Sequence, residues 1–147
     1  MKSERYVVFT DGSCIGNPGP GGVGIIVIDP SGKELELSYP EKYTTNNKME
    51  LTAAILAIGN VPEGCTVELW TDSMYVKNGI TQWIHDWKKK GWLTAQKKPV
   101  KNVVLWKMLD EIRNTRTVQW NWVKAHNKHP LNERVDKLAY NAAVSAK

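Results

Sequence analysis

The order of apolar and polar residues divides the chain into three strands, a helix, and then alternating strands and helices. Runs of strand length predict strands at residues 6–10, 23–28, 33–38, 66–71 and 117–124. Apolar residues at helical spacing, bounded by capping and stop signals, predict helices over 47–59, 103–113 and 132–146. A further short helix is expected after Asp72-Ser73. This order is typical of an α/β fold with a mixed sheet covered by helices.

Two local patterns refine this picture. The glycine- and proline-rich segment 16–22 lies between two strand patterns, so it predicts a hairpin connection and not a domain boundary. The third strand alternates Leu35 and Leu37 with Glu34 and Glu36, which predicts one solvated face. A chain of 147 residues, 41% of them hydrophobic, with no repeat and no linker, is expected to form a single domain.

The N-terminal residues and the cysteines bear on cellular location. No apolar run has the length of a membrane span, and the first residues lack a signal-peptide core. The two cysteines, Cys14 and Cys65, lack metal-ligand spacing, although a single disulfide between them stays open. We therefore expect a reduced, cytoplasmic protein that binds no membrane and, by default, is a monomer.

The positive charge is concentrated in one segment. The whole chain carries a formal charge of +5, whereas residues 77–101 hold seven lysines and one acid, a local charge of +6 that leaves −1 for the remainder. Such a patch in a nearly neutral body indicates a polyanionic partner. An ordinary solvated lysine face is the alternative interpretation.

Four acids have neighbours that suggest chemistry. Asp11 and Asp72 each end an apolar strand, while Glu50 and Asp136 lie in the first turns of predicted helices. Taken singly, each could cap a turn, form a capping box with Asn47, or oppose a helix dipole. Together they would form a cluster of carboxylates without cysteine or paired histidine. Such hard-oxygen sites prefer Mg²⁺ or Mn²⁺ to zinc.

Several motifs along the chain carry a family resemblance. They are Thr-Asp-Gly-Ser-Cys with its glycine-rich continuation at 10–22, Thr-Asn-Asn-Lys-Met-Glu-Leu at 45–51, Thr-Asp-Ser at 71–73, the Trp- and Lys-rich segment 82–102, and Asn-Glu-Arg-Val-Asp at 132–136. In this order, over essentially the whole chain, they resemble bacterial type 1 ribonuclease H. The resemblance implies a five-stranded mixed sheet, three antiparallel strands and then parallel ones, flanked by helices. It also implies one ribonuclease H domain over 1–147, with a basic handle at about 82–101.

The resemblance further implies an activity and its metal site. The protein would be a sequence-nonspecific endonuclease that hydrolyses the RNA strand of RNA–DNA hybrids, leaving 5′-phosphate and 3′-hydroxyl ends. Asp11, Glu50, Asp72 and Asp136 would be the catalytic metal ligands for two Mg²⁺ ions when substrate is bound, with Mn²⁺ as a possible substitute. Two metals about 4 Å apart suit in-line attack at phosphorus, because they generate hydroxide and neutralise the leaving oxygen.

His126 resembles the mobile-loop histidine of the family, which can move a proton near neutral pH. Many members have Gly-His-x-Gly-His at this point, whereas this chain has Ala125 and Lys128 in place of the two glycines. Fewer glycines reduce backbone freedom. A surface-loop histidine without a catalytic role therefore stays the alternative.

The residues expected to contact the hybrid also follow from the resemblance. An RNA strand is recognised through its 2′-hydroxyls in a wide, shallow minor groove. The expected RNA-strand contacts are Cys14, Asn17, Asn46, Glu50 and Met74, the last at a position where some members have Gln. The expected DNA-strand contacts are Thr45 and Asn102 at a phosphate, Trp83 and Trp106 along the channel, and Lys88 and Lys89 in the handle.

The other tryptophans have structural interpretations. Trp87 and Trp92 are expected to form a small core beneath the handle, and Trp83 could equally belong to it. Trp70, Trp120 and Trp122 occupy strand patterns, with the last two on one face.

Two other functions fit parts of the pattern. A DNA-strand transferase or integrase shares this fold and acidic site, but would be expected to carry DNA-binding or assembly domains as well. A noncatalytic duplex-binding module would use the basic handle alone, and the presence of acids at all four positions argues against it.

Overall fold

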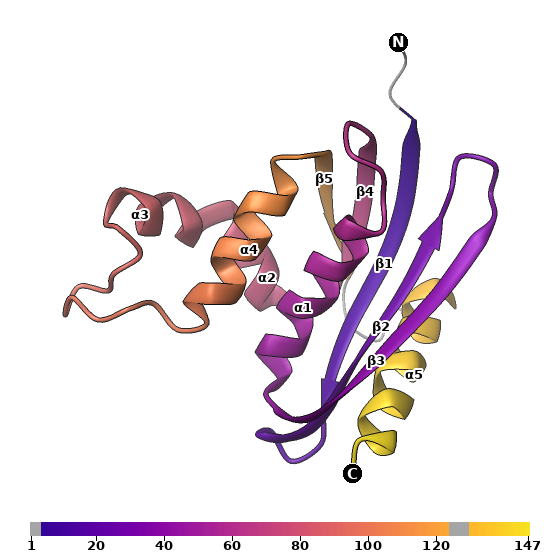
Figure 1. Ribbon diagram of the computed structural model, residues 1–147, viewed down its shortest axis with the longest axis horizontal. Coiled ribbons are helices and arrows are strands. Elements are labelled where there is room, and N and C mark those ends of the chain that lie inside the picture. Colours follow the sequence, from indigo (N-terminus) through magenta and orange to yellow (C-terminus); the bar gives the residue numbers. More distant parts are fainter. Residues whose placement is uncertain (1–3, 124–129) are drawn as a thin grey trace.

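The computed structural model describes residues 4–123 and 130–147, and in these residues the five predicted strands form one sheet (Figure 1). The strand order is β3-β2-β1-β4-β5. The elements in chain order are β1 (Arg5–Cys14), β2 (Gly19–Ile28), β3 (Glu34–Thr44), α1 (Asn46–Gly59), β4 (Thr66–Thr71), α2 (Met74–Asn78), the π-helical turn η1 (Gly79–Trp83), α3 (Ile84–Lys89), α4 (Val103–Arg113), β5 (Thr117–Trp122) and α5 (Pro130–Ser145).

Strand directions confirm the predicted mixed sheet. The β1–β2 and β2–β3 pairs are antiparallel, while β1–β4 and β4–β5 are parallel. The bounds of β4 and α4 agree with the predicted ranges, and α1 begins one residue before its predicted range. In the described ranges no helix is both long and apolar enough to cross a lipid bilayer.

Helices cover both faces of the sheet (Figure 1). On one face α1 and α4 enclose the main core, which includes Val8, Leu51 and Leu69. On the other face α5 packs over β1, β2 and β3, and Val135 meets Phe9 and Ile26 there. Burial of apolar side chains on both faces of β1 explains why its central residues are almost continuously apolar.

The glycine-rich segment forms strand as well as turn. The prediction of a connection over 16–22 was wrong at its C-terminal end, because β2 already begins at Gly19 and pairs with β1 as far as Cys14↔Gly21. Close packing explains these glycines. A Cβ on Gly22 would lie 2.5 Å from the Ala139 carbonyl oxygen and from the Ala142 Cβ, so glycine lets α5 approach the sheet.

The edge strand β3 has the predicted solvated face, and its other face is largely exposed as well. Glu34 and Glu36 lie on the side of α5, where both pair with Arg134. On the opposite side Leu35 is 50% exposed. The packing of α1 explains this exposure, because α1 lies mainly over β1 and β2, and Leu37 is only half-buried against the main core.

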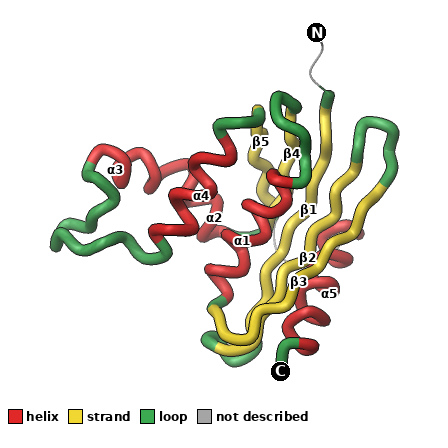
Figure 2. The backbone as a smooth tube through the Cα atoms, viewed as in Figure 1, coloured by secondary structure: helices red, strands yellow, loops and turns green. Residues whose placement is uncertain are grey.

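The handle (residues 82–101) extends away from the sheet as the end of η1, helix α3 and a long loop (Figure 2). An isolated bridge between Leu93 and Pro99 closes this loop. Beneath the handle, Trp83, Trp87, Trp92 and Trp106 form a chain of ring contacts with centroid distances of 5.3–6.3 Å. The core role expected for Trp87 and Trp92 is confirmed, since both pack against the main core.

Candidate active site

The register of two parallel strands brings Asp11 and Asp72 together. The last pair of the β1–β4 ladder is Phe9↔Trp70, and each aspartate lies two residues beyond its member of that pair. Asp72 follows the end of β4, as predicted. Asp11 was predicted at the end of β1 but lies inside it, because β1 continues along β2 with Asp11 opposite Gly24.

Helix α1 adds Glu50 to this pair. The Thr45 side chain caps the helix by accepting a hydrogen bond from the Lys48 amide at 3.2 Å, so the proposed capping box on Asn47 was wrong. The Glu50 carboxylate instead accepts a hydrogen bond from the backbone amide of Gly12 in β1 at 2.7 Å. Gly12 makes this contact possible, because a Cβ there would lie 2.5 Å from the Glu50 nitrogen.

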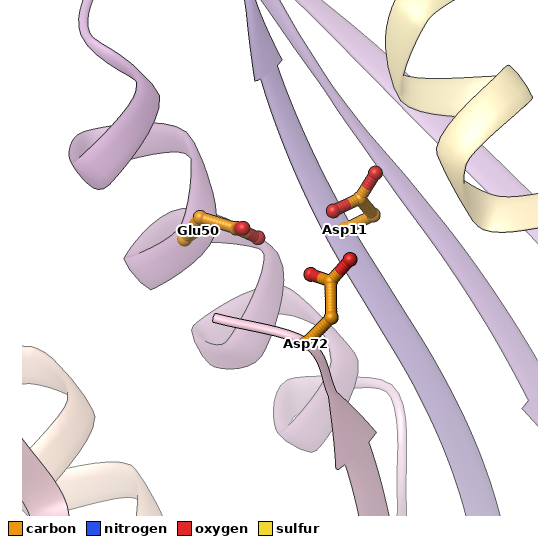
Figure 3. Close-up of side chains that lie close together, drawn as sticks. All are labelled: Asp11, Glu50 and Asp72. Carbon is orange, nitrogen blue, oxygen red and sulfur yellow. The ribbon is translucent and has the colours of Figure 1, made fainter. Parts of the chain in front are cut away.

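The three side chains converge (Figure 3). Asp11, Glu50 and Asp72 each place a carboxylate oxygen within 4.8 Å of the others. Asp11 is only 5% exposed and Glu50 is buried as well. Asp136, exposed on α5, also helps to raise the pKa of Asp11, so the fourth predicted acid borders the same site.

Burial and mutual repulsion perturb the acids strongly. Burial, followed by repulsion from Glu50 and Asp72, raises the pKa of Asp11 to about 10. The pKa of Glu50 is also raised well above its ordinary value, by burial and then by Asp72, although the Gly12 hydrogen bond opposes the rise. The metal-free site therefore retains a proton on Asp11 at neutral pH.

This arrangement fits a divalent cation. The group consists of carboxylates alone, which are hard oxygen donors of the kind that Mg²⁺ and Mn²⁺ prefer. A bound dication would also relieve the repulsion that raises the pKa values of Asp11 and Glu50. Asp11, Glu50 and Asp72 could hold the ion, with Asp136 at the rim.

Most residues expected to contact RNA lie within a few positions, in the sequence, of Asp11, Glu50 or Asp72. The Asn17 side chain accepts a hydrogen bond from the Asn46 backbone amide at 2.9 Å, and this bond joins the β1–β2 turn to the start of α1. Cys14 is half-buried, with its Sγ 3.4 Å from the Thr44 carbonyl oxygen. Met74, at the start of α2, is 47% exposed.

The residues expected to contact DNA divide into exposed and buried groups. Lys89 is exposed, while Lys88 pairs with Asp110 of α4 at 3.2 Å. Asn102 and Trp83 are half-buried. The expected contact of Trp106 with DNA is contradicted, because its side chain is 0% exposed and the η1 backbone at Gly79 packs directly on its indole.

Tyr75 links these residues and was missed by the sequence analysis. Its hydroxyl accepts hydrogen bonds from the Asn102 side chain and the Trp106 indole, both at 3.0 Å. No periodic or motif signal marks Tyr75, because the partners lie 27 and 31 residues away. His126 lies outside the described residues.

Comparisons with known proteins agree with this geometry. The family model described as RNase H matches residues 3–144. Ribonuclease H of Citrobacter koseri is 57% identical over 142 residues, covering 97% of this chain and 91% of that protein. Among solved structures, this chain superposes on LC9-RNase H1, which is a type 1 RNase H with the type 2 active-site motif. The TM-score is 0.87 at 34% sequence identity, and the match covers 100% of this chain and 75% of that one. LC11-RNase H1 in complex with RNA/DNA hybrid gives 0.69 at 25% identity, covering 96% of this chain and 98% of that one.

Proposed function

The chain belongs to the RNase H family, and from this premise we propose that it cleaves RNA–DNA hybrids by a two-metal-ion mechanism. Enzymes of this family are metal-dependent hydrolases that cleave RNA in RNA/DNA hybrids. The proposal specifies a sequence-nonspecific endonuclease whose products carry 5′-phosphate and 3′-hydroxyl ends. The observation that carries it is the convergence of Asp11, Glu50 and Asp72 within 4.8 Å.

We propose Asp11, Glu50, Asp72 and Asp136 as the ligands of Mg²⁺, with Mn²⁺ as a substitute. Two ions held there about 4 Å apart would activate the attacking water and neutralise the leaving oxygen. The fold supports this role, because β1, α1 and the residue that follows β4 place three of the carboxylates together before substrate arrives. His126 is proposed to move a proton at the same site.

The RNA strand is proposed to lie along Cys14, Asn17, Asn46 and Glu50, with Met74 against a ribose. The Asn17–Asn46 hydrogen bond supports a preformed surface, since it joins two polar residues from distant parts of the chain, and Asn46 begins the helix that carries Glu50. Polar groups fixed in this way can bind 2′-hydroxyls, which the DNA strand lacks.

The DNA strand is proposed to contact Thr45, Asn102, Trp83, Lys88 and Lys89, without Trp106. The bond from Asn102 to Tyr75 supports this role for Asn102 by holding its side chain in place. Exposed lysines of the handle would bind phosphates and release counterions. Lys88 would contribute less than Lys89, because Asp110 already pairs with it.

We also propose a domain organisation, an oligomeric state and a location for the protein. Residues 1–147 are proposed to form one RNase H domain that acts as a monomer in the cytoplasm. Cys14 and Cys65 are both free in the structure.

The test is cleavage of a hybrid whose RNA strand carries a 5′ label, with Mg²⁺ and with EDTA. Duplex DNA and duplex RNA of the same sequence are the controls. We expect Mg²⁺-dependent internal cleavage of the hybrid alone, and mass spectrometry of the fragments should identify 5′-phosphate ends. Asp72→Asn should abolish cleavage while largely retaining hybrid binding. Joining of DNA ends would favour a strand transferase, and binding without cleavage would favour a duplex-binding module.

A further inference from the structure

Trp122 is a large aromatic residue that does not lie in the core. It is the last residue of the edge strand β5 and is 38% exposed. Trp120, two residues earlier, packs against the main core. Both rings border an apolar cavity of about 180 Å³ beside the end of β4. Burial in the core therefore accounts for Trp120 but not for Trp122.

The indole of Trp122 contacts the backbone of the proposed metal ligand Asp72. Its Nε1–H donates to the Asp72 carbonyl oxygen at 3.3 Å. The amide of Ser73 belongs to the same peptide group and donates to the Thr71 Oγ1 at 3.1 Å. Both polar ends of the Asp72–Ser73 peptide are thus held, which fixes the orientation of its plane.

Strand pairing ends immediately before this peptide. The β4–β5 ladder closes with Thr71↔Trp122, and the Val123 amide donates to the Thr71 carbonyl oxygen at 2.8 Å. Helix α2 begins only at Met74. The peptide after Asp72 lies between these two regular elements, so the Trp122 hydrogen bond restrains it where the ladder no longer does.

Lys77 restrains the indole from α2. Its ammonium nitrogen lies 4.6 Å from the centre of the Trp122 ring, within the range of a cation–π interaction. The ring is therefore held between α2 and the strand end although it is partly exposed.

We propose that Trp122 is a positioning residue for Asp72. By fixing the Asp72–Ser73 peptide, it keeps the Asp72 carboxylate beside those of Asp11 and Glu50 and raises the affinity of the site for Mg²⁺. Partners that orient metal ligands commonly change metal affinity by about 10- to 100-fold. The inference rests on the proposed metal site, and the experiment separates the two.

The test compares Trp122→Phe with Trp120→Phe. The first variant keeps a ring for Lys77 but loses the N–H donor. The second makes the same change at the other ring beside the cavity, without touching Asp72. Calorimetric titration of the substrate-free proteins with Mg²⁺ measures the dissociation constant, and melting in EDTA measures stability. We expect binding about tenfold weaker for Trp122→Phe and nearly unchanged for Trp120→Phe.

A second variant guards against misfolding of Trp122→Phe. Benzothienylalanine in place of Trp122 keeps the bicyclic shape and replaces only the N–H by sulfur, and it should weaken Mg²⁺ binding to the same extent. If a folded variant without the N–H binds Mg²⁺ as the wild type does, the positioning role is refuted. If the wild-type protein itself binds no Mg²⁺, the proposed metal site is refuted instead.

Discussion

Replacing Asp11 by asparagine should stabilise the metal-free protein at neutral pH. The carboxyl group lies buried beside Glu50 and Asp72, and these surroundings raise its pKa from 3.8 to about 10. Asparagine has nearly the same shape but carries no charge. The substitution therefore removes the cost of the carboxyl group with little change in shape.

The magnitude follows from proton linkage. Between pH 3.8 and about 10 the folded protein holds a proton on Asp11 that the unfolded chain has released. The native state binds more protons in this window, so the free energy of unfolding falls by about 1.4 kcal/mol per pH unit as pH rises. At neutral pH the accumulated cost is about 4 kcal/mol, from roughly three pH units. Asp11→Asn should recover up to that amount.

The assay is urea unfolding of both proteins in EDTA at about pH 5, 7 and 9. The stability difference should grow with pH by about 1.4 kcal/mol per unit. Excess Mg²⁺ should shrink or reverse it, because the wild type binds the ion more tightly and gains about 2.7 kcal/mol at 100 times the dissociation constant. A difference that does not change with pH, or a less stable Asp11→Asn in EDTA, would refute the crowded-carboxylate argument.

Further substitutions test the handle, His126 and the packing at the site. The double variant Lys89→Ala with Lys90→Ala should weaken hybrid binding. It should also reduce the slope of log affinity against log salt concentration by about 0.9 for each phosphate that the protein no longer binds, while Lys88→Ala alone should change the slope less. An unchanged slope in the double variant would leave these lysines as a solvated face. His126→Ala should slow cleavage without abolishing it, and single-turnover kinetics at saturating Mg²⁺ would measure the rate. A complete loss of cleavage would make His126 essential, and no loss would support a surface-loop role. Gly12→Ala should cost about 1–3 kcal/mol in urea unfolding and reduce Mg²⁺ affinity, because its Cβ would displace α1; wild-type stability would disprove the close packing.

Local sequence was enough to predict the main elements and to single out all four proposed metal ligands. Apolar periodicity and capping signals predicted β4 and α4 with the observed bounds, because local preferences and burial agree in those segments. The Thr-Asp-Ser motif at the end of β4 likewise identified Asp72 as a candidate ligand, since the chain must leave the sheet there.

The way distant segments meet depended on tertiary packing. The end of β1 is set by its pairing with β2, and glycines that resemble a turn in the sequence instead allow α5 to approach the sheet. The family resemblance placed Trp106 at the DNA strand, yet the backbone of η1 covers its indole. Tyr75 and Trp122 act through partners far apart in sequence. Such contacts arise from the packing of whole elements, and no local pattern encodes which side chains will face each other where two elements meet.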